Sequence, residues 1–92
     1  MKITDVRIRL ITHEKVKAVA SITIDGVFTV HDIKLINGEN GQFIAMPSAK
    51  NAEGEFKDVA HPLNSETRSM LQRIIEEKYE KVKAADERAK EA

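Results

Sequence analysis

The chain has 92 residues and a mass of 10.3 kDa, which allows one domain with one modest core and excludes a multidomain enzyme. Its 15 basic and 15 acidic side chains give zero net charge with histidine neutral, so a nucleic-acid site would have to be a local basic patch. Hydrophobic residues at 41% and charged residues at 33% indicate a small folded domain, and the absence of cysteine excludes disulfides and thiolate metal sites.

The first stretch, residues 1–11, alternates between apolar and polar side chains. Its apolar residues fall on one side of a period of two and its basic residues, Arg7 and Arg9, fall on the other, which is typical of a half-buried strand. Charged residues interrupt the stretch, so we expect neither a signal sequence nor a membrane span. We therefore expect a cytoplasmic protein.

Two further strands are predicted around a tight turn. Residues 18–24 alternate again, and the run at 27–36 is long and rich in β-branched side chains. Asp25-Gly26 lies between them, and a type I′ turn needs positive φ at both central residues, which this dipeptide tolerates. The sequence thus predicts an antiparallel hairpin centred on Asp25-Gly26.

Turn-forming residues at 37–41 close the third strand, and residues 42–46 predict a fourth strand that Pro47 ends. We expect a polar loop at 48–55 and a short fifth strand at 56–60, before His61-Pro62. The predicted fold class is α+β: a twisted, mainly antiparallel sheet of about five strands that carries a C-terminal helix.

From Asn64 the apolar period changes to about 3.6, and Asn64 or Ser65 can cap a helix start. We expect the docking stripe to contain Thr67, Leu71, Ile74, Ile75, Lys78 and Val82, with Tyr79 at its edge. We expect the following residues to face outward: Arg68, Arg73, Glu76, Glu77, Glu80 and Lys81. Residues 1–83 then form a single domain, and residues 84–92 form a charged tail that is helical or frayed.

The histidines do not predict catalysis or metal binding. His31 and Asp32 are neighbours in a strand, where adjacent side chains point to opposite faces, so we expect no proton relay between them. His13 and His61 lack companions at ligand spacing. We expect His31 and His61 to be partly buried and hydrogen-bonded, and we expect no enzyme activity, metal, cofactor or small-molecule substrate.

Basic side chains are the remaining candidates for a binding site. Six of them could form a stripe across neighbouring elements: Arg7, Arg9, Lys17, Lys34, Lys50 and Lys57. Their even mixing with acidic residues favours an ordinary solvated face. The phenylalanines, Phe28, Phe43 and Phe56, are too far apart in sequence to predict a platform for base stacking, and we expect them in the core.

Several segments resemble the stage V sporulation protein G (SpoVG) family. They are Thr-Asp-Val-Arg at 4–7, Ala-Ser-Ile-Thr-Ile-Asp at 20–25 and Val-His-Asp-Ile-Lys at 30–34. The most specific are Phe-Ile-Ala-Met-Pro-Ser at 43–48 and Gly-Glu-Phe-Lys-Asp-Val-Ala-His-Pro-Leu-Asn-Ser at 54–65. Together they cover about residues 1–82.

The resemblance implies a small bacterial regulator that binds DNA, and in some members RNA, as a dimer, with roles in sporulation, septation and gene expression. By position it implies nucleic-acid contacts at or near the helix, at Arg68, Arg73, Lys78 and Lys81. The loop after the Met-Pro-Ser motif is typically Lys-Arg-Thr in the family, whereas this chain has Ala49-Lys50-Asn51. Lys50, Arg7 and Arg9 complete the set of candidate contacts.

We also expect a homodimer, because a small sheet with long strands, such as the one at 27–36, leaves an unpaired edge that a second copy can pair. The alternative function is a protein-interaction module that modulates cell division with little direct DNA contact. The salt dependence of binding separates the two, because phosphate contacts weaken steeply with salt and an apolar protein interface does not.

Overall fold

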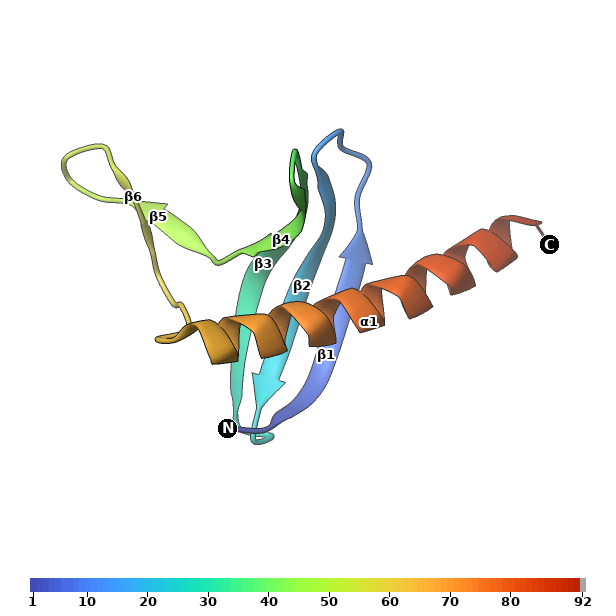
Figure 1. Cartoon of the computed structure of the whole chain (residues 1–92), viewed down its shortest axis with the longest axis horizontal. Helices are drawn as coiled ribbons and strands as arrows, with labels where there is room; N and C mark the ends of the chain where they lie inside the picture. Colours follow the sequence, from blue (N-terminus) through green and yellow to red (C-terminus); the bar gives the residue numbers. More distant parts are fainter. Residues whose placement is uncertain (92) are drawn as a thin grey trace.

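The computed structural model describes residues 1–91, which form six strands and one helix. They are β1 (Ile3–Leu10), β2 (Val16–Ile24), β3 (Phe28–Gly38), β4 (Gly41–Ala45), β5 (Ser48–Lys50), β6 (Phe56–Asp58) and α1 (Ser65–Glu91). Strands β1 to β4 pair antiparallel in chain order, β5 and β6 form a separate antiparallel pair, and α1 crosses one face of the larger sheet (Figure 1). The predicted α+β class is confirmed.

The fifth predicted strand does not join the main sheet. Residues 56–58 pair with residues 48–50, which the sequence assigned to a polar loop. The resulting hairpin projects from the body of the molecule (Figure 1). Its Asn51 side chain accepts hydrogen bonds from the amides of Glu53 and Glu55, at 2.9 and 3.0 Å, which stabilises the turn locally.

The core lies between α1 and the inner face of the β1–β4 sheet. Its fully buried aliphatic side chains are Ile22, Ile33, Leu35, Ile44 and Ile75. Ala18 and Ala20 of β2 are also buried, and their small side chains leave room for the helix above the sheet. The alternation predicted for residues 18–24 is confirmed in β2, where Ala18, Ala20 and Ile22 are buried.

The Asp25-Gly26 turn is confirmed. Both residues have positive φ, 51° and 69°, and the amide of Val27 donates to the carbonyl of Ile24 at 3.0 Å. The Asp25 side chain also accepts a hydrogen bond from the amide of Lys2, at 3.1 Å, which ties the turn to the start of β1. The φ pattern is that of a type I′ turn.

Replacing Gly26 by valine is expected to lower the free energy of unfolding by about 1–3 kcal/mol. A Cβ atom at Gly26 would meet nothing within 4 Å, so the cost comes from holding a β-branched residue at positive φ. Urea denaturation measures the effect. Gly26→Asn is the matched control, since asparagine tolerates this conformation, and equal midpoints for the valine variant and wild type would contradict the assignment.

The helix begins as predicted. The Asn64 side chain accepts from the amide of Thr67 at 2.8 Å, which is the geometry of an N-cap. Leu71, Ile75 and Tyr79 are buried, whereas Lys78, which the periodicity assigned to the docking stripe, is exposed. Lys78 lies on the flank of the helix because the buried stripe is centred closer to Ile75 than the sequence indicated. The helix continues through residues 84–91 and extends beyond the sheet (Figure 1).

The prediction that the phenylalanines belong to the core is wrong. Phe28, Phe43 and Phe56 are 62%, 42% and 71% exposed. Phe28 begins β3 near a turn, Phe43 alternates with the buried Ile44, and Phe56 lies in the projecting hairpin. Phe43 and Phe56 therefore lie outside the area that α1 covers, and Phe28 lies at its margin, where it lines a hollow with Thr67 and Leu71.

The histidine prediction is half confirmed. His31 and His61 are exposed rather than partly buried. Both are hydrogen-bonded, His31 Nδ1 to Ser21 Oγ and His61 Nδ1 to the carbonyl of Pro62, each at 3.0 Å. In the part of the chain that the structure describes, no helix has the length and apolar character needed to cross a membrane.

Candidate nucleic-acid interface

A bulge in β3 places two polar side chains on the face of the sheet that points away from α1, here called the outer face. Ile22 pairs with Val30 and Ala20 pairs with Ile33, so the two residues between on β3 oppose one on β2. Asp32 has φ of 62°, a conformation that aspartate tolerates. His31 and Asp32 therefore share the outer face, which corrects the expectation that they point to opposite faces.

A second bulge removes Lys17 from the predicted basic stripe. Val16 pairs with Ile36 and Ala18 with Leu35, which leaves Lys17 as the extra residue on β2. Its Nζ lies 5.8 Å from the ring centroid of Tyr79 on α1. Lys17 thus belongs to the helix side of the sheet.

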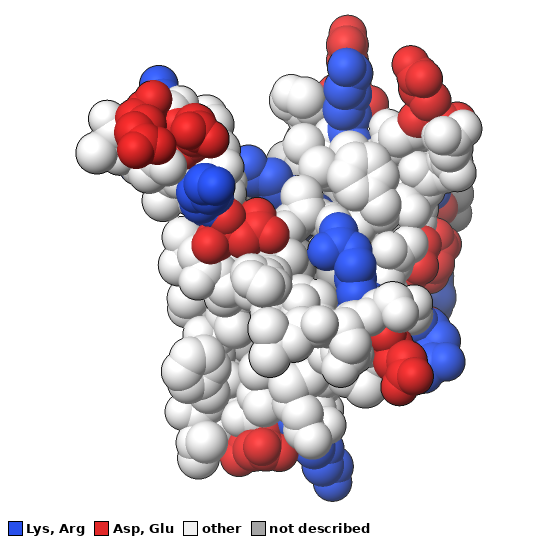
Figure 2. Space-filling view, turned by 60° about the vertical axis from the view of Figure 1, so that its left-hand side comes forward, with Lys and Arg blue, Asp and Glu red and all other residues white. Residues whose placement is uncertain are grey.

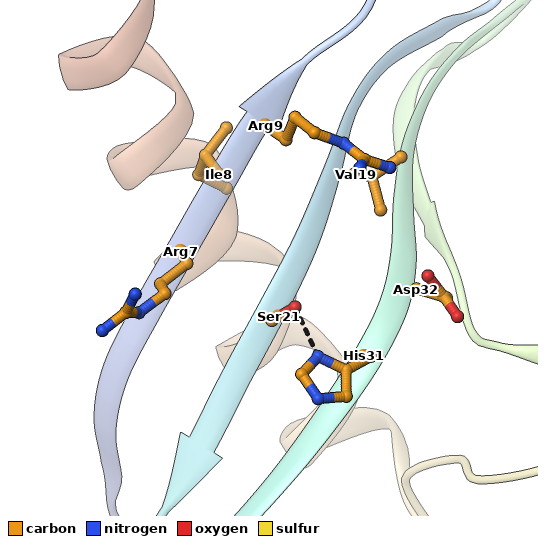
Figure 3. Close-up of a pocket in the computed structure, with 7 residues that line it drawn as sticks. All are labelled: Arg7, Ile8, Arg9, Val19, Ser21, His31 and Asp32. Atoms are coloured by element: carbon orange, nitrogen blue, oxygen red, sulfur yellow. Dashed lines mark hydrogen bonds between the residues drawn. The ribbon is translucent and has the colours of Figure 1, made fainter.

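The outer face is hollowed between β1, β2 and β3 (Figure 3). The hollow has a volume of about 430 Å³ and is lined by Arg7, Ile8, Arg9, Val19, Ser21, His31 and Asp32. The Ser21–His31 hydrogen bond crosses its floor. Arg9 reaches over Val19 and His31 lies across the hollow from it, whereas Arg7 points away from the other labelled side chains and Asp32 adds a negative charge (Figure 3). The hollow is therefore a candidate anion site whose main cation is Arg9.

Strand register fixes the cations of the outer face. Arg9 pairs with Val19, and Val19 pairs with Lys34, so the three side chains lie in one row across β1, β2 and β3. Arg7 Nε donates to Asp5 Oδ2 at 3.1 Å, which leaves its terminal nitrogens for other acceptors. Among residues 1–91, Arg9 and Lys34 form no ion pair.

The prediction that Arg68 faces outward is wrong. Its side chain is half-buried, and a guanidinium nitrogen donates to the carbonyl of Ile44 in β4. Arg68 precedes Leu71 by three residues and Ile75 by seven, so it lies on the same side of the helix as the buried residues. This spacing is the signal in the sequence that could have revealed its position.

The other helix candidates are exposed but have acidic neighbours. Arg73 has Glu76 and Glu77 at spacings of three and four. Lys78 and Lys81 line a separate hollow of about 290 Å³ between α1 and β1, together with Asp5 and Glu77. The positive potential of this side of the molecule is therefore weakened locally.

Lys50 lies in the projecting hairpin. Its Nζ is 5.9 Å from the ring centroid of Phe56. Acidic side chains gather on the same hairpin (Figure 2), which contains Glu53, Glu55 and Asp58. The structure thus divides the seven candidates among three places: Arg7 and Arg9 on the outer face, Lys50 in the hairpin, and the remainder on α1. It adds Lys34, Ser21 and His31 to the outer face.

These features define a small α+β protein whose sheet is covered by a helix on one face and carries basic side chains on the other. No group of three metal-ligating side chains occurs in residues 1–91.

The SpoVG family model matches residues 1–81. The chain is 61% identical over 88 residues to "Putative septation protein SpoVG" of Caldicellulosiruptor bescii, which covers 95% of this chain and 100% of that protein. It is 60% identical over 87 residues to the protein of the same name in Clostridium perfringens, covering 94% and 97%. A Thermoanaerobacter relative of that name is 59% identical over 92 residues, covering 99% and 100%. The chain belongs to the SpoVG family, as the sequence motifs indicated.

Proposed function

We propose that this chain is a nucleic-acid-binding regulatory protein, without enzyme activity, that acts in the cytoplasm on septation and on gene expression linked to sporulation. The name of its relatives supports the septation role. The nucleic-acid part rests on one observation, the arrangement of Arg7, Arg9 and Lys34 on the open outer face of the sheet.

Phosphate is the ligand that best suits these side chains. A guanidinium group offers paired donors that match phosphate oxygens, and Arg9 makes no ion pair that would compete within residues 1–91. The chain has no net charge, so its overall field does not attract nucleic acid, and binding must depend on this local group of cations. We therefore expect weak binding per subunit.

The test compares one variant on each face of the molecule. Arg9→Gln is expected to weaken binding in a mobility-shift titration. It should also reduce the slope of log affinity against log salt by about 0.7–0.9 for each phosphate that the variant no longer neutralises. Arg73→Gln on α1 is the matched control, because it removes the same charge from an exposed helix position, and it should change binding little.

Two results would contradict the proposal. The first is that no nucleic acid binds at low salt, which would exclude the function and favour the protein-interaction module. The second is a protein partner whose affinity hardly changes with salt, because such a partner would bind through the exposed apolar residues. These residues include Met1 and Phe28 beside an apolar hollow of about 200 Å³.

We also propose that two copies associate. The apolar residues Phe56, Val59 and Leu63 are exposed on and after the projecting hairpin, and Phe28 is exposed beside the apolar hollow. Burying such side chains against a second copy removes apolar surface from water. A dimer also doubles the number of phosphate contacts per particle.

Sedimentation equilibrium at micromolar concentration is expected to show a species of twice the monomer mass of 10.3 kDa. Phe28→Asp should shift the equilibrium toward the monomer, because a charge would be buried in the interface. Thr29→Asp, one residue further along β3 and on the opposite side of the strand, is the matched control. A single species of monomer mass for the wild type would contradict association.

A further inference from the structure

Two hollows on the outer face adjoin each other. The hollow between β1, β2 and β3 meets a second one of about 470 Å³ that reaches the loop after β4. Both are lined by Arg9, Val19 and Asp32, so together they form one continuous depression, here called the outer groove. Its far end is lined by Pro47 and Ser48, part of the most specific sequence motif.

Charged and apolar side chains alternate across this groove. Strand register places Arg9, Val19, Lys34 and Ala45 in one row over the four strands. Neighbouring strands are about 5 Å apart, so the two cations of the row are separated by about 10 Å, with an apolar side chain between them. Such a surface suits a ligand that has both negative charge and apolar faces.

We propose that the outer groove binds an extended single-stranded nucleic acid, with its phosphates on Arg7, Arg9 and Lys34 and its bases on the apolar side chains between them. This assignment rests on the proposed function and specifies the form of the nucleic acid. A single strand exposes base faces, which stack on apolar and aromatic side chains, and every base has such a face. Phe43, which is 42% exposed and pairs with Ile36 on this face, offers a ring.

A duplex fits this surface less well. Its bases are stacked on one another, so the apolar side chains of the groove would meet only sugars and phosphates. The major groove admits a helix or a two-stranded ribbon, whereas this face is a four-stranded sheet. The apolar residues of the row thus contribute to binding only when the strand is single.

Two polar residues of the groove also affect binding. The hydrogen bond between Ser21 Oγ and His31 Nδ1 fixes the ring of His31 and leaves Nε2 for a phosphate or a base edge. Asp32 lies in the same groove and opposes a phosphate there. Asp32→Asn keeps a residue that tolerates positive φ and removes the charge. It is expected to increase affinity about two- to fivefold.

The experiment is fluorescence anisotropy with four labelled probes of about 12 units, a length within the range of single-strand sites. The probes are oligo-dT, oligo-rU, a mixed-sequence duplex and an abasic deoxyribose-phosphate strand. We expect a single strand to bind at least about fivefold more tightly than the duplex and the abasic strand, since each stacked base adds affinity. Comparison of the affinities for oligo-dT and oligo-rU shows whether the groove prefers DNA or RNA.

Variants locate the site. Arg9→Gln and Lys34→Gln should weaken oligonucleotide binding severalfold, while Arg73→Gln on α1 leaves it unchanged. Absence of binding to all probes would overturn the proposed function itself. Equal affinity for single strand, duplex and abasic strand would overturn the single-strand proposal alone. The single-strand proposal would also be overturned if Arg9→Gln bound the oligonucleotides as tightly as wild type while Arg73→Gln bound them more weakly. In both cases nucleic-acid binding itself would stand.

Discussion

Replacing Ile75 by alanine is expected to lower the free energy of unfolding by about 2–5 kcal/mol, the range for a large buried aliphatic side chain. Ile75 is fully buried and belongs to the cluster that joins α1 to Ile22, Leu35 and Ile44. The ladder of the sheet prevents these strands from closing the void. A domain of this size has a total stability of about 5–14 kcal/mol, so the variant is left with only part of it.

Urea denaturation followed by circular dichroism measures this effect. Ile75→Val is the first control and should cost about 0.5–1.5 kcal/mol, because it removes one methylene group. Ile74→Ala is the second, since Ile74 is the neighbouring residue and is half-buried. Its effect should be clearly smaller. An Ile75→Ala midpoint equal to that of wild type would contradict the docking of α1 through this face.

Local signals predicted most of the fold. The tolerance of Asp25-Gly26 for positive φ determines where the first hairpin turns, and the side chain of Asn64 determines where the helix begins. Both depend on residues within a few positions of each other. For the same reason the alternation over residues 18–24 predicted β2, in which Ala18, Ala20 and Ile22 are buried.

The candidate site was less predictable because two bulges shape it. A strand with a bulge breaks the period of two, and a single sequence does not reveal which residue is the extra one. One signal was present: Val30 and Ile33 are three apart, both apolar, and separated by two polar residues. Only a bulge between them lets both face α1, and that same bulge turns His31 and Asp32 to the outer face.

The remaining errors concern contacts that are distant in sequence. Whether a phenylalanine is buried depends on how far α1 extends over the sheet, and Phe43 and Phe56 lie outside that area. Strands β5 and β6 pair only with each other, so the apolar side chain of Phe56 did not indicate that this segment packs on the core. Composition and periodicity carry no information on either point.

The edge of β4 explains the position of Arg68. Arg68 donates to the carbonyl of Ile44, and Gln72, one turn further along α1, donates to the carbonyl of Gln42 at 2.9 Å. The two acceptors are alternate residues of an edge strand, and the two donors are four residues apart on the helix. Side chains of α1 therefore occupy backbone acceptors that an edge strand otherwise presents to other chains.

Arg68→Ala is accordingly expected to lower the free energy of unfolding by about 1–3 kcal/mol, because it leaves the carbonyl of Ile44 without its charged donor. Arg73→Ala should change stability by no more than about 0.5 kcal/mol, since its side chain is exposed. Thermal and urea denaturation of the two variants make the comparison. Assignment of Arg68 to the outward face of the helix would instead predict that both variants are as stable as wild type. Equal denaturation midpoints would therefore mean that Arg68 is free to contact a phosphate. If Arg68→Ala is less stable, as expected, its nucleic-acid binding must be measured under conditions in which the variant is fully folded.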